Sequence, residues 1–326
     1  MSLSRVALPC ELWDAIIDHL HDDAAALCAS ALVCRSWVPA SRFHRFEEIS
    51  LSQKSGFRAA RLNALLASPC GTIAPAVQSL TFPDALAPIQ IRNPGTGQVF
   101  IKTLLELVPR ATQLQHVRAL TLSDLPWPLL RSLKNVQELT LTRVCIGQCL
   151  VDVVAVLPEL RRLTLDGVTA VPYRGHLDVG GGDAPTTRLD TVTIRGSSIA
   201  FLGWLALAAP HARALSITDL APRDLEYLLA YVNAVGPELE TLDLAFYGGN
   251  FDEVLLPPLL APCTSLQILR LHFSAPCDVE RFFAFGGVFA HHPCPLQIVV
   301  PASSDVAAMN DFSFIQEGLV SFVCSQ

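Results

Sequence analysis

Apolar residues recur along most of the chain in a six-residue pattern, apolar-x-x-apolar-x-apolar, whose copies begin 19 to 40 residues apart. Because side chains alternate faces along a strand, each copy predicts a short strand whose fourth and sixth residues enter the core, while the third and fifth point away. The copies start at Val77 (VQSLTF), Val117 (VRALTL), Val136 (VQELTL), Leu160 (LRRLTL), Leu189 (LDTVTI), Ala212 (ARALSI), Leu239 (LETLDL) and Leu266 (LQILRL), with a degenerate ninth copy, LQIVVP, from Leu296.

Helix-like segments separate these strands, and proline often stands where they start or stop. One strand per unit, returned by a helix, gives a parallel sheet that curves because helices are wider than strands. We therefore expect an α/β solenoid of about eight or nine irregular repeats over residues 77–326, with the sheet on its concave face and the helices outside. The predicted helices are Gln148–Leu157, Phe201–Ala209, Asp224–Val235 and Val279–Phe289.

These repeats resemble the leucine-rich repeat family, with one departure. The family carries Asn or Cys at position nine, where the side chain bonds neighbouring turns. This chain has other residues there, so we expect irregular turns. They are Ala85, Leu125, Val144, Val168, Ser197, Leu220, Tyr247 and Ser274.

Residues 1–50 lack the repeat and predict helices at Glu11–His21, Ala24–Val33 and Ala40–Phe46. Residues 51–76 form a predicted connector, helical around Arg58–Leu66. Three regions follow: a helical domain at 1–50, the connector, and the solenoid.

The N-terminal motifs are the most specific signal in the chain. They read Leu8-Pro9-x-Glu11-Leu12, then Ile16-Ile17, Leu20 and Leu27, and finally Leu32-Val33-Cys34-Arg35-x-Trp37. Over about 40 residues this string resembles an F-box of the fungal type. The spacing of Leu12, Ile16 and Leu20 also predicts one apolar helix stripe, which so small a unit cannot easily bury on itself.

The resemblance implies a substrate-recognition adaptor of an SCF-type (Skp–cullin–F-box) ubiquitin ligase. In this family the F-box docks on a Skp-type adaptor protein and the repeats hold a protein substrate, so the chain itself is expected to be no enzyme and to need no cofactor or metal. A non-catalytic binding scaffold whose N-terminal helices only cap the repeats stays open as an alternative. The adaptor-binding residues that the resemblance implies are Leu8, Pro9, Leu12, Ile16, Leu20, Val33 and Trp37.

A substrate surface is predicted on the strands, where the fifth residues read Thr81, Thr121, Thr140, Thr164, Thr193, Ser216, Asp243 and Arg270. The threonines are explained by strand propensity alone. Near the end of this row, charged and aromatic residues of the types enriched in binding hot spots gather on neighbouring strands. The predicted substrate-binding residues are Asp243, Phe246, Tyr247, Arg270 and His272.

The composition of the chain excludes some classes of structure and function. The chain is 51% hydrophobic and 16% charged, which excludes disorder over most of its 326 residues. Its net charge of −7 gives no reason to expect nucleic acid or an anionic membrane as a partner. The ten cysteines are irregularly spaced and include no Cys-x-x-Cys pair, and no apolar run is long enough for a signal peptide or a membrane helix. These features predict a cytoplasmic or nuclear protein with reduced, mostly buried thiols.

No catalytic or metal motif stands out. His291, His292 and Cys294 lack a second ligand pair at zinc spacing, and Gly180–Gly182 lacks the Lys-Ser or Lys-Thr of a phosphate loop. Regulation of a GTPase, known for other leucine-rich repeat proteins, would need an exposed arginine beside a polar patch. Arg195 and Arg223 stand without such a setting.

Overall fold

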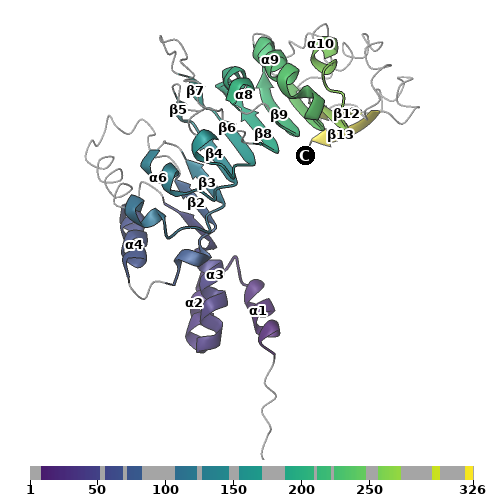
Figure 1. The fold of residues 1–326 in the computed structure, drawn as a ribbon. Coiled ribbons are helices and arrows are strands. Elements are labelled where there is room, and N and C mark those ends of the chain that lie inside the picture. Colours follow the sequence, from purple (N-terminus) through teal and green to yellow (C-terminus); the bar gives the residue numbers. More distant parts are fainter. Residues whose placement is uncertain are drawn as a thin grey trace, which may run out of the picture. The chain divides into compact units, whose positions relative to one another are not determined.

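The computed structural model of the chain describes residues 9–51, 56–68, 72–82, 107–122, 127–146, 154–170, 188–208, 211–221, 224–246, 256–272, 296–301 and 320–325. These fall in two compact units, Met1–Val136 and Gln137–Gln326, each of which is described by itself. Figure 1 labels most of their helices and strands.

The first unit opens with three α-helices at the places that the sequence predicts. The helix predicted at Ala24–Val33 has those bounds, and the other two differ by a few residues at their ends. In Figure 1, the second and third lie side by side. The helices are α1 (Cys10–Asp18), α2 (Ala24–Val33) and α3 (Val38–Glu47), with the 3-10 turn η1 (Arg35–Trp37) before α3.

Local chemistry sets two of these helix starts. The Asp23 carboxylate accepts hydrogen bonds from the backbone N–H groups of Ala25 and Ala26, each at 2.9 Å, and so caps α2. Pro39 lies in the first turn of α3, where its missing N–H costs nothing.

Parallel strands then begin in the same unit. They pair in the order β1 (Glu48–Ser50), β2 (Ser79–Phe82) and β3 (Ala119–Leu122). The helix predicted around Arg58–Leu66 is present as α4 (Gly56–Ala67). The same unit also contains η3 (Ala74–Ala76) and α6 (Trp127–Ser132).

Strand β1 was missed by the sequence analysis, although residues 46–51, FEEISL, carry the same six-residue pattern. Its Ile49 pairs with Leu80, the fourth position of the next copy. Leu51, at the sixth position, is 1% exposed. The sheet therefore begins inside the range 1–50 that the sequence analysis assigned to helices.

In its described residues, the second unit contains eight parallel strands that neighbour one another in chain order. A separate short ladder pairs β5 (Cys145–Ile146) with β7 (Thr169–Ala170). The α/β class and the parallel sheet are thus confirmed. The eight strands are β4 (Glu138–Thr142), β6 (Arg162–Asp166), β8 (Thr191–Arg195), β9 (Ala214–Leu220), β10 (Thr241–Phe246), β11 (Ile268–His272), β12 (Leu296–Pro301) and β13 (Val320–Ser325).

The core consists of the repeated apolar positions. In all eight clear copies of the pattern, positions one, four and six are 6% exposed or less, while positions three and five are more open. This confirms the predicted alternation. At position nine, where the leucine-rich repeat family has Asn or Cys, this chain has buried apolar residues in three copies. They are Val144, Val168 and Leu220.

The predicted ninth copy is wrong in register. The sequence analysis placed Leu296 at position one, but the structure pairs it with Leu269, which occupies position four. One further strand, β13, follows and pairs Val320 with Leu296. The pattern failed here because LQIVVP is apolar at four of its positions, so its phase is not defined by the residues alone.

In the second unit, helices lie between successive strands along the chain. Helix α9 contacts both α8 and α10 (Figure 1). They confirm the predictions at Phe201–Ala209 and Asp224–Val235. Most of the predicted helix Gln148–Leu157, and all of Val279–Phe289, lie outside the described residues. The described elements are η5 (Gly196–Phe201), α8 (Leu202–Ala208), α9 (Leu225–Val235), η7 (Gly236–Glu238) and α10 (Leu256–Leu260).

Candidate functional site

Apolar side chains lie exposed on the N-terminal helices, where the F-box resemblance places adaptor contacts. In α1, Leu12 is 50% exposed and Ile16 is 44% exposed, while the adjacent Ile17 is fully buried. Val33, the last residue of α2, is 63% exposed. These helices therefore bury one apolar side and leave another side open to solvent.

The other predicted adaptor residues differ in exposure. Pro9, which precedes α1, is exposed, and Leu20 is half-buried. Trp37 is also half-buried, because its ring packs on Trp13 with centroids 4.8 Å apart and planes tilted by 46°. It therefore joins η1 to α1. Leu8 lies outside the described residues.

A polar contact also holds α1 in place. The His44 Nε2 atom of α3 lies 2.6 Å from the Asp18 Oδ1 atom at the end of α1. Together with the tryptophan pair, this contact ties one side of α1 to the rest of the helical region. The side that carries Leu12 and Ile16 stays open.

Leu32 is a highly exposed apolar residue that the predicted adaptor site omitted. It is 87% exposed, more than any other large apolar residue that the structure describes as exposed. The signal was present in the sequence, because Leu32 and Val33 stand together before Cys34-Arg35-x-Trp37. We therefore define the helical patch as Leu12, Ile16, Leu32 and Val33.

Cys34 follows this patch and departs from the expectation of buried thiols. It is exposed, whereas Cys28 is half-buried and Cys263 is buried, and none of these three forms a disulfide. Its sulfur lies 3.0 Å from the Ser36 hydroxyl, and this hydrogen bond, with lesser help from the backbone of Trp37 and Ser36, lowers the pKa of Cys34.

The predicted substrate-binding residues meet in part on β10 and β11. Asp243 pairs in register with Arg270, and His272 Nε2 lies 2.7 Å from Asp243 Oδ1. Phe246 is half-buried at the end of β10. Tyr247 lies outside the described residues. The structure thus brings three of the five residues together on the face of the sheet opposite the core.

The row of fifth positions is confirmed within each unit. Thr81 pairs with Thr121 in the first unit. In the second unit each member pairs with the next, and every one is half-buried rather than buried. The row there runs Thr140, Thr164, Thr193, Ser216, Asp243 and Arg270.

Charged residues of alternating sign directly precede four neighbouring strands of the second unit, β6, β8, β9 and β10. These residues are Arg161, Asp190, Arg213 and Glu240, and each of the last three donates its backbone N–H to the carbonyl of the preceding member at 2.7–3.1 Å. The Arg161 and Asp190 side chains lie 3.9 Å apart. Opposite charges on adjacent repeats favour this register.

A second ionic cluster centres on Glu238. Its carboxylate lies 3.3 Å from Arg188 Nη2 and 3.0 Å from His211 Nδ1. The Arg188 hydrogen bond is the main cause that lowers the pKa of Glu238, and His211 adds to it. This cluster joins residues 27 and 50 positions apart along the chain.

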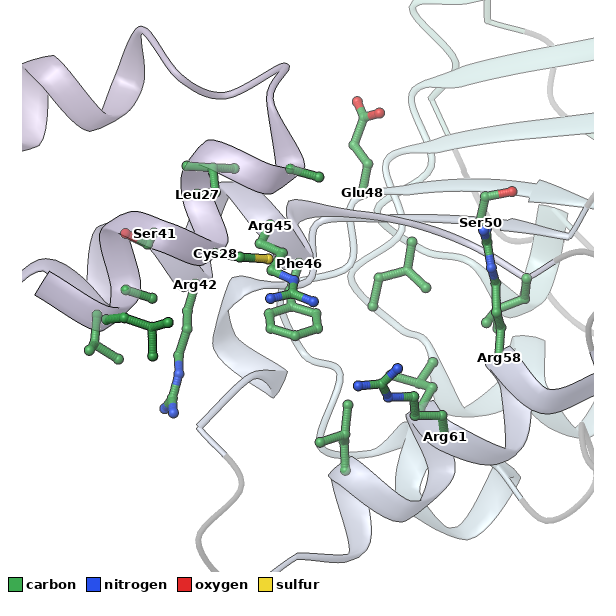
Figure 2. A pocket seen from close by; sticks show the side chains of 18 residues that line it. Leu27, Cys28, Ser41, Arg42, Arg45, Phe46, Glu48, Ser50, Arg58 and Arg61 are labelled. Carbon is green, nitrogen blue, oxygen red and sulfur yellow. The ribbon is translucent and has the colours of Figure 1, made fainter.

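A pocket of about 800 Å³ opens in the first unit between α2, α3, β1 and α4 (Figure 2). Leu27 and Leu62 in its wall are buried, and Phe46 is half-buried. The sequence analysis did not find this pocket, because its walls come from four elements.

No group of three metal-ligating side chains occurs among the described residues. His291, His292 and Cys294 lie outside them. Within the same part of the chain, every helix is too short or too polar to span a bilayer.

Comparison with known proteins gives no family for this chain. No family model matches the sequence, and no curated protein matches it. A crystal structure of an internalin (inlF) from Listeria monocytogenes is similar over 100% of this chain and 95% of that chain, with 11% sequence identity and a TM-score of 0.32. A likeness at this level carries no argument, so function is argued from the residues of the chain itself.

Proposed function

We propose that the chain is a substrate-recognition adaptor of an SCF-type ubiquitin ligase. The observation that carries the proposal is the helical patch of Leu12, Ile16, Leu32 and Val33, exposed within the segment that resembles an F-box. Exposed apolar side chains on short helices can dock in a hydrophobic groove on a partner. Under this proposal the partner is a Skp-type adaptor, and through it a cullin-RING ligase.

The patch is large enough to support docking. Full burial of a Val, Leu or Ile side chain is worth about 1.5–3 kcal/mol. Scaled by exposures of 50%, 44%, 87% and 63%, covering the four residues would contribute roughly 4–7 kcal/mol. A helical cap would have no need to leave these residues open, which favours docking over the capping alternative.

The parallel repeats supply the second half of the proposal. We infer that they form an irregular leucine-rich-repeat solenoid whose open sheet face holds a protein substrate. The Asp243–His272 pair beside Arg270 is the charged part of that face. The chain would perform no chemistry, and it would raise the effective concentration of substrate near a charged ubiquitin-conjugating enzyme.

Co-expression of the full chain with a Skp-type adaptor, followed by size-exclusion chromatography, tests this function. We expect a one-to-one complex. The double variant Leu12→Ser/Ile16→Ser removes two exposed side chains at little cost in folding and should weaken the complex roughly 10- to 100-fold, by the same area reasoning. Tyr227→Ser, which removes a side chain 43% exposed on α9, is the matched control and should leave the complex intact.

A folded, monodisperse chain that ignores the adaptor would overturn the ligase role. The repeats would then remain as a binding scaffold with helices at one end. Equal binding by the wild type and the double variant would instead show that the docking residues lie elsewhere.

A further inference from the structure

The pocket of the first unit combines an apolar interior with a basic rim. Four arginines line it, Arg42, Arg45, Arg58 and Arg61, against a single carboxylate, Glu48. In Figure 2 the Glu48 side chain extends away from Arg58 and Arg61. The whole chain carries a net charge of −7, so this local excess of positive charge is opposite to the average of the protein.

Two of the arginines already have contacts within the protein. Arg42 Nη1 donates to Thr72 Oγ1 at 2.6 Å, and the Arg45 guanidinium lies 5.7 Å from the centroid of the Phe46 ring. These contacts hold both side chains at the rim of the pocket.

Arg58 and Arg61 are different. Both project from α4, and Figure 2 shows Arg61 extending toward Phe46 and Arg58 toward Ser50. Neither side chain has a hydrogen bond or ion pair with any residue in the part of the chain that the structure describes. A guanidinium carries five N–H donors and favours planar anions, so two of them at one pocket suit an anionic group.

The interior of the pocket suits a different chemistry. Leu27, Leu62, Leu65 and Ile49 line it together with Phe46, and its volume of about 800 Å³ lies within the range of small-molecule sites. A free inorganic anion would leave this apolar surface uncovered. A purely apolar ligand would leave the arginines without a partner.

We propose that this pocket binds an amphipathic anion, a small molecule with an apolar chain or ring system and one carboxylate or phosphate head group. The apolar part lies against the leucines, and the head group accepts hydrogen bonds from Arg58 and Arg61. Leu32 belongs both to the lining of this pocket and to the helical patch. The inference is still tested separately from the ligase role, because the two arginines that carry it lie on α4, outside the helical patch.

Calorimetric titration of the full chain tests the proposal with four probes below their micellar concentrations. Dodecanoate and dodecyl phosphate carry both features and differ in head group, so they separate the two sources of negative charge. Dodecanol and inorganic phosphate each carry one feature. We expect saturable one-to-one binding of at least one amphipathic anion, and at least tenfold weaker binding of the two single-feature probes.

Variants then locate the site. The double variant Arg58→Gln/Arg61→Gln should weaken binding at least tenfold, while Arg58→Lys/Arg61→Lys should retain part of it because the charge remains. The matched control is Arg131→Gln on α6, an exposed arginine of the same unit outside the pocket. It should bind as the wild type does.

Cysteine alkylation gives a second readout, independent of heat signals. Cys28 lines the pocket and is half-buried, whereas the exposed Cys34 is no part of its lining. Bound ligand should slow alkylation of Cys28 and leave Cys34 unchanged, as followed by peptide mass spectrometry.

The proposal is overturned if neither amphipathic anion binds at one per chain, or if inorganic phosphate binds as tightly as they do. It is also overturned if the Gln double variant, shown folded by circular dichroism, binds as the wild type does. Failure of adaptor docking would not change any of these results.

Discussion

Tyr231 offers a direct test of the packing in the second unit. This residue of α9 is fully buried, and its hydroxyl has no hydrogen-bond partner among the residues that the structure describes. Burial raises the pKa of its phenol far above the ordinary value, so the group stays neutral at any ordinary pH. The variant Tyr231→Phe removes the oxygen and leaves the ring in place.

The magnitude follows from the cost of an unpaired buried polar group, which is about 1–3 kcal/mol. Removing the oxygen leaves a small void that offsets part of this gain. We therefore expect Tyr231→Phe to raise the free energy of unfolding by roughly 1 kcal/mol. For a unit of this size that corresponds to about 2–4 °C in the melting temperature.

Urea denaturation followed by circular dichroism measures the effect, with an unchanged slope and a higher midpoint expected. Tyr227→Phe is the matched control, because Tyr227 lies on the same helix and is 43% exposed. It should leave the midpoint unchanged. A loss of 1 kcal/mol or more in Tyr231→Phe would refute the reasoning, since it would mean that the hydroxyl stabilises the fold.

Three further predictions concern single positions. Gly236, at the end of α9, lies so close to the backbone of Pro262 that an added Cβ would be 2.9 Å from it. Gly236→Ala should therefore lower the free energy of unfolding by about 1–3 kcal/mol in the same urea assay, and an unchanged stability would contradict this contact. The folded-state pKa of Glu238 is lowered mainly by Arg188, so its contribution to stability is complete above the ordinary value of 4.5 and disappears as pH falls through the lower folded pKa. The difference in urea midpoint between the wild type and Glu238→Gln should therefore be small but measurable at pH 7 and should disappear as the pH falls below 4.5. A difference that does not depend on pH would disprove this role of the Glu238 carboxylate. Cys34, whose pKa is lowered chiefly by its hydrogen bond with Ser36, should be alkylated faster at pH 7.5 than in the Ser36→Ala variant, and equal rates would contradict that cause.

Much of the fold followed from the apolar pattern. Each clear copy of the six-residue pattern became a strand with positions one, four and six buried, because a strand with one face on the core buries every second side chain. The pattern failed where it lost contrast. FEEISL was overlooked beside helical residues, and LQIVVP was placed in the wrong register because too many of its positions are apolar.

The candidate site was also predicted only in part from the sequence. The motif around Leu12, Ile16 and Val33 identified the helices, and the periodicity of α1 indicated an apolar face. It did not show that Leu32 is the most open of these side chains, or that Trp37 packs on Trp13. Exposure depends on which neighbours cover a helix, and those neighbours come from other segments.

The sequence by itself determined the α/β class, the parallel strands, the buried positions of each copy and the helical start of the chain, because these depend on local periodicity. Only the tertiary structure decided which apolar residues stay exposed, that Asp243 and His272 meet, and that Arg58 and Arg61 share a pocket with Leu27. Those features join residues that lie far apart along the chain. Their distances depend on how helices and strands pack, which no pattern within one segment records.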